Sequence, residues 1–247
     1  MSQQVTNDNL VLLVGKAANG KSTSLRGLKN PEGVMYLNCE AGKKLPFKAK
    51  FKQYNITEPV KQIQQAFAAA EAKPEIHTIV IDSLTYLMDM YESMHVLTLQ
   101  NKMEGWSNFA QFFKYMMQQL VAKSTKNVIF TAHVKDEVTD EMVRETAVPI
   151  KGALKNNGVE SYFSCVIAAK KKKLTDLEGY QSAMLNITPQ EEALGFKYVF
   201  QTMITKDTVN ERLRGPLDLF APNETFIDNN MQLVLDRLHE YYDDETA

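Results

Sequence analysis

The sequence predicts an α/β fold in which helices flank a central, mainly parallel sheet and antiparallel strands are added at its C-terminal side. Three observations support this prediction. Short apolar runs alternate with helical patterns as far as about residue 133. A glycine-rich turn joins the first of these runs to a helical pattern, and strand-like runs follow one another with little helix between them after about residue 150. Strands that alternate with helices form parallel sheets, whereas strands without intervening helices pair antiparallel.

The first strand is predicted at residues 10–14, LVLLV, because this short apolar run is rich in branched side chains. It is followed at residues 15–22 by GKAANGKS, which fits the phosphate-binding pattern G-x-x-x-x-G-K-[ST] at every fixed position. Glycines let the backbone wrap a phosphate, and a helix that begins after the loop points its free N–H groups at the anion. In this pattern Lys21 would reach the β- and γ-phosphates, and the Ser22 hydroxyl would ligate Mg²⁺. We therefore expect a nucleotide to contact Gly15, Lys16, Ala17, Ala18, Asn19, Gly20, Lys21, Ser22 and Thr23.

The remaining elements follow from apolar spacing and from helix breakers. Residues 58–72 are predicted to be helical because Ile63, Phe67 and Ala70 share one face, and Pro74 ends that helix. By the same reasoning, helices are expected at residues 22–28, 84–97, 106–122 and 233–242. Strands are expected at residues 33–38, 76–81, 127–132, 163–169 and 198–205, with a further one at 184–187, while residues 41–56 resemble a loop.

Composition restricts the class of protein. The 247 residues are enough for one large domain, with a core at about residues 9–220 followed by a helix and an acidic tail at about 221–247. The formal net charge of −2 gives no general attraction to nucleic acid, so any such binding must come from local patches. The two cysteines lie far apart, which predicts a reducing, cytoplasmic setting, and we expect no signal peptide and no membrane span.

Three polar residues follow predicted strands, at the sheet edge where ligands of open α/β folds bind. Asp82 follows the strand at 76–81 and is placed to organise Mg²⁺ for the phosphate loop, or otherwise to cap the next helix. Glu40 follows the strand at 33–38, where a carboxylate can polarise the water that attacks the γ-phosphate, or otherwise belongs to a surface loop. His133 either hydrogen-bonds the γ-phosphate or is a partly exposed loop histidine.

The order of these motifs resembles the RecA-like group of phosphate-loop ATPases. The phosphate loop is followed by YLNCE at residues 36–40, IVIDS at 79–83 and FTAH at 130–133. In that group the catalytic glutamate follows the strand after the phosphate-loop helix, and the metal aspartate is often followed by serine. A polar residue, often Gln or His, follows the fourth strand and couples the nucleotide state to DNA-binding loops. Size and layout are most similar to the short phage RecA-like ATPases of the single-strand annealing type, over about residues 9–220.

The resemblance implies Mg²⁺-dependent hydrolysis of ATP coupled to single-stranded DNA in phage-type recombination or replication. It implies that Glu40 is the water-activating base and that His133 senses the γ-phosphate. It further implies that residues 134–155 form a DNA-binding loop. The implied partners are single-stranded DNA, further copies of the chain and a single-strand DNA-binding protein, in the host cytoplasm for a phage-encoded protein.

RecA-like ATPases commonly bind ATP between subunits, and the neighbouring subunit supplies a cation to the γ-phosphate. Lys206 and Arg212 follow the predicted strand at 198–205, where such residues would lie, and Arg214 is an alternative to Arg212. The resemblance therefore implies that Lys206 and Arg212 act across an interface of a homo-oligomer. As residues of a solvated hairpin they would have no such role.

Several features leave alternatives open. The segment after His133 is more acidic than DNA contact favours. The run KKKK at residues 170–173 either follows a phosphate backbone or is a solvated turn, and Trp106 either stacks on bases or belongs to the core. Two other functions therefore remain: the ATPase core of a hexameric DNA helicase, which shares the catalytic set, and a nucleotide-binding switch or assembly scaffold without a DNA role.

Overall fold

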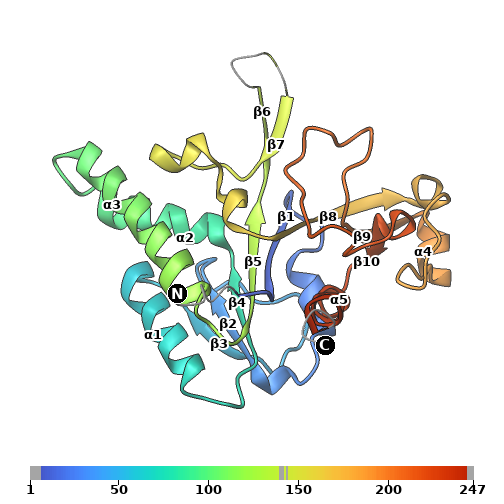
Figure 1. Cartoon of the computed structure of the whole chain (residues 1–247), viewed down its shortest axis with the longest axis horizontal. Coiled ribbons are helices and arrows are strands. Elements are labelled where there is room, and N and C mark those ends of the chain that lie inside the picture. The colour runs from blue at the N-terminus through green and yellow to red at the C-terminus, as the bar shows by residue number, and fades with distance from the viewer. Residues whose placement is uncertain (1–6, 139–141, 143, 244–247) are drawn as a thin grey trace.

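The computed structural model describes residues 7–138, 142 and 144–243. One sheet with helices on both faces forms its body, and the strands stand in the order β10-β9-β8-β1-β5-β4-β2-β3 (Figure 1). The strands of this sheet are β1 (Leu10–Gly15), β2 (Val34–Asn38), β3 (Lys52–Asn55), β4 (Thr78–Asp82), β5 (Asn127–His133), β8 (Cys165–Lys173), β9 (Phe196–Gln201) and β10 (Phe226–Asp228). The α-helices are α1 (Pro59–Glu71), α2 (Leu84–Tyr91), α3 (Lys102–Tyr115), α4 (Pro189–Leu194) and α5 (Met231–Asp243).

The sheet is parallel from β8 to β3 and antiparallel beyond β8. The strands β8, β1, β5, β4, β2 and β3 run parallel to one another, whereas β9 is antiparallel to β8 and β10 to β9. This confirms the predicted fold class, with a mainly parallel sheet and antiparallel strands at its C-terminal side. β1 lies between β5 and β8, and β5 separates it from β4. The carboxyl ends of β1, β2, β4 and β5 therefore share one edge of the sheet.

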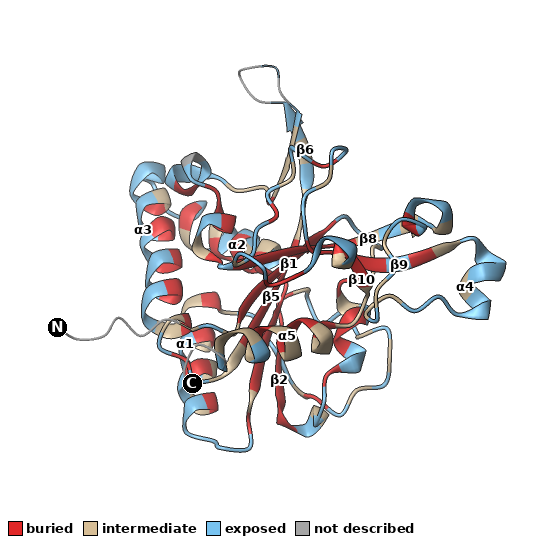
Figure 2. Ribbon diagram, turned by 45° about the vertical axis from the view of Figure 1, so that its right-hand side comes forward, coloured by how far each residue is buried: buried red, intermediate tan, exposed pale blue. Residues whose placement is uncertain are grey.

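The central strands of the sheet are buried (Figure 2), and their alternating side chains build a core on each face of the sheet. In β1, Leu10, Leu12 and Val14 point to the face covered by α1, α2 and α3. Val11 and Leu13 point to the opposite face, which residues 22–28 and α5 cover. A strand buried on both faces is a continuous apolar run, which explains why the pattern LVLLV predicts it well.

The helix expected at residues 22–28 is a 3₁₀ helix, Ser22–Gly27, and not an α-helix. The Ser24 hydroxyl donates to the Lys21 carbonyl at 2.6 Å. Short polar side chains form α-helices poorly because they compete in this way with the hydrogen bonds of the backbone. Gly27 packs closely against the Asn230 side chain at the start of α5. The turn after the phosphate loop is therefore held by its own side chains and by α5.

Other boundaries also differ from the predictions. The expected loop at 41–56 contains β3, whose four exposed or half-buried residues carry no apolar signal. The strand expected at 198–205 lies at Phe196–Gln201, because the Gln201 side chain bonds Met203 O and the chain turns there. Residues 184–187 form no strand, although Met184 O accepts from Asp228 N at 2.8 Å. The strand expected at 163–169 is longer: β8 continues to Lys173, and it pairs parallel with β1 as well as antiparallel with β9.

A separate antiparallel hairpin, β6 (Lys135–Val138) and β7 (Arg144–Ala147), follows β5 directly. It projects from the edge of the sheet where the parallel strands end (Figure 1). Thr146 N donates to Asn210 O at 3.0 Å, so the hairpin is attached to the segment that follows β9. Residues 139–141 and 143 of the expected DNA-binding loop, and 244–247 of the acidic tail, lie outside the described residues. Among the described residues, no helix combines the length and the apolar character needed to cross a bilayer.

Candidate nucleotide site

The ends of the parallel strands enclose a cavity of about 240 Å³, here called the nucleotide cavity. Its wall combines most of the phosphate loop with the three polar residues predicted at strand ends. Its lining residues are Ala17, Ala18, Gly20, Lys21, Ser22, Thr23, Tyr36, Glu40, Lys43, Lys44, Leu45, Pro46, Asp82 and His133. Residues that are far apart in the sequence therefore meet around one space at the end of β1.

Two glycines of the phosphate loop are required by the backbone. A Cβ on Gly15 would lie 2.7 Å from the carbonyl oxygen of Ala169 in β8, so only glycine fits there. Gly20 has a φ of +87° and lies against the side chains of Tyr198 and Asn229, and Ala18 also has a positive φ of 61°. These positions turn the chain sharply between β1 and Ser22. The loop thus has the curved backbone that wraps a phosphate.

Lys21 is buried, with 6% of its surface exposed. Its ammonium donates to Gly15 O at 2.8 Å and to Lys16 O at 3.1 Å, so the loop's own carbonyls hold it at the cavity wall. Burial lowers the pKa of Lys21 to about 8, although the nearby Asp82 and Glu40 carboxylates favour the charged form. Lys21 is therefore a poorly solvated cation, which an anionic phosphate would stabilise strongly.

Asp82 is held by hydroxyl groups that come from three different segments. Its Oδ2 accepts from Ser22 Oγ at 2.8 Å and from Tyr36 Oη at 2.7 Å, and its Oδ1 accepts from Thr131 Oγ1. Burial, and next the Asp82 carboxylate, raises the pKa of Tyr36 far above its ordinary value, so the phenol keeps its proton and donates. Asp82 is 2% exposed. The carboxylate therefore has a fixed position beside the Ser22 hydroxyl.

Glu40 lies between two nitrogen donors on the cavity wall. Its Oε1 is 3.3 Å from His133 Nε2, and its Oε2 accepts from Lys43 Nζ at 2.6 Å. The hydrogen bond from His133 is the largest cause that lowers the pKa of Glu40, to about 2, and Lys43 acts in the same direction against burial. Glu40 is therefore a carboxylate at neutral pH, able to accept a proton from water.

His133 connects the two charged residues of the cavity. Its Nδ1 lies 3.4 Å from Lys21 Nζ. Because an ammonium only donates, Nδ1 is the acceptor in this pair, and Nε2 carries the hydrogen that points at Glu40. The His133 backbone N–H donates to Thr85 Oγ1 at 2.9 Å, and the Tyr86 ring lies edge-on to the imidazole at 5.7 Å. The ring is thus oriented from both sides, directly before β6.

Sequence reasoning missed Tyr36, Lys43 and Thr131. Tyr36 and Thr131 lie inside strands, where tyrosine and threonine are common and indicate no function. Only the pairing of β2 and β5 with β4 directs both hydroxyls at Asp82. Lys43 was one lysine of an apparent loop. For Tyr36 and Thr131 the available signal was a hydroxyl within two residues of the end of a strand that a candidate residue follows or ends. For Lys43 it was a cation three residues after Glu40.

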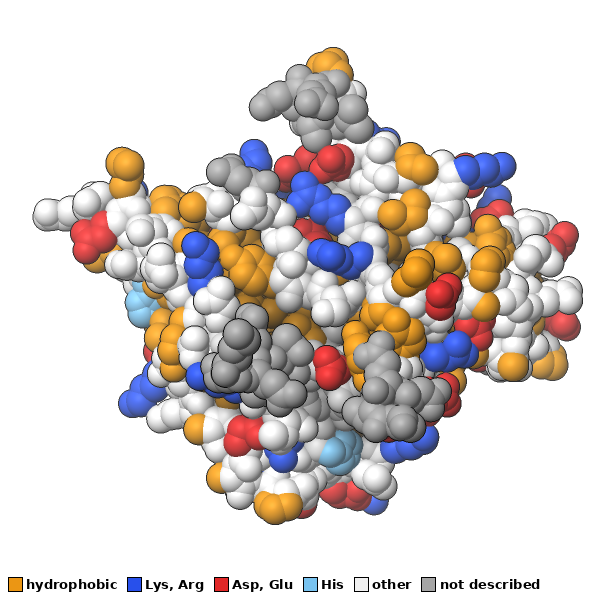
Figure 3. Space-filling view, in the orientation of Figure 1, with side chains coloured by type: hydrophobic (Ala, Val, Ile, Leu, Met, Phe, Trp, Pro, Cys, Tyr) orange, Lys and Arg blue, Asp and Glu red, His pale blue; other side chains and the backbone are white. Residues whose placement is uncertain are grey.

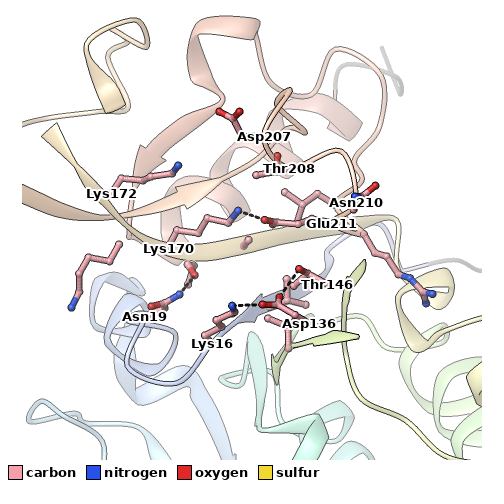
Figure 4. Close-up of a pocket in the computed structure, with 18 of the residues that line it drawn as sticks. Lys16, Asn19, Asp136, Thr146, Lys170, Lys172, Asp207, Thr208, Asn210 and Glu211 are labelled. Atoms are coloured by element: carbon pink, nitrogen blue, oxygen red, sulfur yellow. Dashed lines mark hydrogen bonds and ion pairs between the residues drawn. The ribbon is translucent and has the colours of Figure 1, made fainter. Parts of the chain in front are cut away.

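Three residues predicted to contact the nucleotide line a different cavity from the nucleotide cavity. Gly15, Lys16 and Asn19 line a second cavity of about 550 Å³, here called the junction cavity, between the phosphate loop, the hairpin, β8 and residues 207–213 (Figure 4). Lys16 Nζ donates to Asp136 Oδ2 at 2.8 Å, and Asn19 Nδ2 donates to Ala169 O at 3.2 Å. The Lys16 and Asn19 side chains are therefore engaged outside the nucleotide cavity.

The cations predicted to act between subunits lie away from the nucleotide cavity of their own chain. Arg212 lines the junction cavity and pairs with Glu145 at 2.9 Å and Glu160 at 3.6 Å. Lys206 is exposed in the turn after β9. Action on a neighbour's nucleotide needs a second subunit, so both roles stay predictions.

The four lysines at 170–173 are not a solvated turn, because they continue β8. Lys170 Nζ pairs with Glu211 at 2.5 Å. Lys171 lies over the rings of Phe196 and Tyr198, at 5.1 and 5.2 Å from their centroids. The run is engaged by the adjoining segments, which limits its freedom to follow a phosphate backbone.

Three comparisons relate the chain to known proteins. A family model described as an AAA domain matches residues 7–219. The chain belongs to this AAA domain family. Comparison with curated proteins gives no significant match. Among solved structures, a KaiC-like protein from the hyperthermophilic archaeon Pyrococcus horikoshii OT3 is similar, with 14% sequence identity, a TM-score of 0.43 and 82% of each chain covered.

Membership of the AAA domain family confirms the predicted enzyme class. The protein is a phosphate-loop ATPase, and the match extends from before β1 to beyond Arg212, so it includes each predicted site residue of this AAA domain. The roles of the individual side chains follow from their geometry and stay predictions.

Proposed function

We propose that this ATPase hydrolyses ATP with Mg²⁺ as a homo-oligomer and couples hydrolysis to single-stranded DNA, in strand annealing or pairing of the phage type. The observation that carries the proposal is the position of His133. Its imidazole lies within 3.4 Å of Lys21 and 3.3 Å of Glu40, and the chain enters the projecting hairpin two residues later. A change at the γ-phosphate can therefore reach the hairpin through one residue.

The oxygen donors of the cavity fit a magnesium ion. Ser22 Oγ and Asp82 Oδ2 lie 2.8 Å apart on the cavity wall, and hydroxyl and carboxylate oxygens are the ligands that Mg²⁺ prefers. In the part of the chain that the structure describes, no three His, Cys, Asp or Glu side chains form a metal cluster. Phosphate and water oxygens would therefore complete the coordination. When bound, Mg²⁺ neutralises charge on the β- and γ-phosphate oxygens.

The charged side chains then divide the chemistry. Lys21 donates to the β- and γ-phosphates in place of the loop carbonyls that it contacts now. Glu40, held as a carboxylate by His133 and Lys43, orients the attacking water and accepts its proton. Protonation of Glu40 weakens its bond to His133, so the histidine senses turnover. Lys206 or Arg212 of a neighbouring subunit would add positive charge as the phosphoryl group transfers.

One observation favours a function without DNA. Asp136 and Glu137 in β6 and Glu145 in β7 make the hairpin acidic, which disfavours a phosphate backbone. Asp136 is, however, engaged by Lys16 and Arg144, and Glu145 by Arg212, so part of this negative charge is neutralised within the chain. A nucleotide switch without a DNA role is thus the alternative outcome of the test.

Steady-state ATPase of the pure protein, with and without single-stranded DNA at low and at moderate salt, tests the proposal. Stimulation that fades as salt rises is expected, because phosphate contacts release counterions. Lys21→Ala should abolish turnover at both salts, which excludes a contaminating ATPase. An unstimulated rate with no DNA binding at low salt would overturn the DNA role and favour the switch. ATP-driven unwinding of a DNA duplex would instead support the alternative function as the ATPase core of a helicase.

A further inference from the structure

A third cavity, of about 590 Å³, shares His133 with the nucleotide cavity but is not lined by Glu40. We call it the aromatic cavity. α2 supplies Tyr86 and Met88, α3 supplies Trp106 and Phe109, and the segment at 149–151 closes the remaining side. Its size is that of a site for a small organic group. Ala17 of the phosphate loop and His133 also line it, so it borders the nucleotide site.

The floor of the aromatic cavity is built from rings. Trp106 is half-buried and packs edge-on against the buried Phe109, with centroids 5.7 Å apart and planes at 87°. Gly152 has a φ of +67°, and a Cβ on it would lie 3.0 Å from the indole, so the backbone approaches Trp106 closely there. Tyr86 is 45% exposed, so its ring is open to solvent beside His133. Flat aromatic surfaces that stay open to solvent suit a planar ligand.

The mouth of the cavity carries charges of both signs. Lys151 Nζ is 2.8 Å from both carboxylate oxygens of Glu92, and Lys135 is exposed on β6. Asp89 and Glu137 complete the rim. Hydrophobic side chains bordered by Lys or Arg side chains are visible below the hairpin in Figure 3. Lys151 is thus paired with Glu92, and Lys135 is the rim lysine that shows no ion pair among the described residues. A phosphate would stay at Lys135, while a neutral planar group could enter.

We propose that the aromatic cavity takes one unstacked base of single-stranded DNA, with Tyr86 and Trp106 as its stacking surfaces. This inference rests on the proposed function. Lys135 and the segment at 149–151 belong to the stretch after His133 that the function assigns to DNA, so the cavity is continuous with that surface. Tyr86 touches the His133 ring, so a bound base would press on the residue that reports the γ-phosphate. One base would therefore connect DNA binding to turnover.

The intrinsic fluorescence of Trp106 tests the proposal in the unmodified protein, because the chain has one tryptophan. A homopolymeric single-stranded oligonucleotide is titrated while tryptophan alone is excited. We expect saturable quenching with the same midpoint as binding measured by anisotropy of a labelled oligonucleotide. An abasic oligonucleotide of equal length should leave the emission unchanged, and equal quenching by both would overturn base insertion. A change in Trp106 emission per molecule when the protein concentration is raised without DNA would also overturn the proposal, because a neighbouring subunit would then fill the cavity.

The two measurements separate this inference from the function on which it rests. Binding by anisotropy without any change in Trp106 emission would overturn the cavity proposal and leave the DNA role intact. Absence of binding in both would overturn the DNA role itself.

A pair of matched variants gives a second readout. Tyr86→Leu should weaken single-stranded DNA binding about tenfold, the usual loss for one stacked base. Tyr115→Leu is the control, because Tyr115 is 43% exposed but lies at the far end of α3, outside the cavity. It should bind DNA within about twofold of the unmodified protein. Equal losses in the two variants, or none in Tyr86→Leu, would overturn the proposal.

Discussion

The nucleotide cavity and the junction cavity meet at the phosphate loop, yet their charged groups are held in different ways. In the nucleotide cavity Asp82 is buried and accepts hydrogen bonds from hydroxyls of three segments. In the junction cavity the contacts are ion pairs between partly exposed side chains, Lys16 with Asp136 and Lys170 with Glu211 (Figure 4). Buried hydrogen-bonded groups keep one geometry, whereas exposed ion pairs contribute little and exchange partners readily.

This difference indicates a division of labour. The nucleotide cavity is preorganised, so chemistry there depends on single atoms in fixed places. The junction cavity links the phosphate loop to the hairpin and to residues 207–213 through contacts that can be remade. Substitutions in the nucleotide cavity should therefore change ATP turnover strongly. Substitutions in the junction cavity should change the stimulation of turnover by DNA only mildly.

The largest effect is expected for Glu40→Gln. The amide keeps the shape of the side chain but cannot accept a proton from water, so kcat should fall about 10²- to 10⁴-fold, the usual contribution of a general base. Binding of a fluorescent ATP analogue should stay within about threefold, because Lys21 and the loop hold the phosphates. Glu32→Gln, at an exposed acid away from the cavity, is the control and should turn over normally. Near-normal turnover of Glu40→Gln would remove Glu40 from the mechanism.

A smaller effect is expected from the titration of Lys21. Burial lowers its pKa to about 8 in the free protein, and bound phosphates favour the charged form and raise that pKa. Nucleotide affinity should therefore be full below pH 8 and fall by up to about tenfold per pH unit above it. The dissociation constant of the fluorescent analogue, measured from about pH 7 to about pH 9.5, checks this.

Lys21→Arg is the control for this pH dependence. A guanidinium stays charged across the range, so the affinity of the variant, whatever its absolute value, should be flat with pH. A parallel decline in both proteins would assign the pH dependence to another group.

The contrast between the two cavities also explains what the sequence could predict. Asp82 and His133 end apolar strands that are buried on both faces, and Lys21 follows β1 in the phosphate loop, so the sequence could place all three at one edge of the sheet. Tyr36 and Thr131 were missed because their role depends on the strand register, which places β2 and β5 beside Asp82. The two strands of the hairpin were missed because each has four residues with no alternation of apolar and polar side chains.

The junction cavity could not be predicted for a different reason. Apart from the pair Arg144 and Asp136 within the hairpin, its ion pairs among the described residues join positions more than forty apart, such as Lys170 with Glu211, without any periodic pattern. The run at 170–173 reads as a solvated turn until β9 pairs with it and supplies the rings beneath Lys171. Contacts of this kind depend on the finished topology, whereas the phosphate loop depends on local sequence.

The smallest effect is expected for Asp136→Asn, which tests whether the junction cavity transmits the nucleotide state. Asp136 accepts from Lys16 Nζ and Thr146 Oγ1, each at 2.8 Å, and from Arg144. These bonds, that of Lys16 first, hold the pKa of Asp136 well below its ordinary value, so it is a carboxylate throughout the neutral range. The amide should keep basal turnover within about twofold, because exposed ion pairs contribute little, and reduce stimulation by single-stranded DNA about two- to fivefold.

Asp176→Asn is the matched control for this prediction, because Asp176 lines the same cavity but, within the described residues, shows no bond to the phosphate loop. It should leave both the basal rate and the stimulation unchanged. The ratio of ATPase rates with and without DNA, measured for the three proteins at one salt concentration, decides between two explanations. A loss confined to Asp136→Asn means that the hairpin and the phosphate loop communicate through Lys16 as well as through His133. Full stimulation in Asp136→Asn means that His133 alone carries the coupling and that the ion pairs of the junction cavity only brace the hairpin.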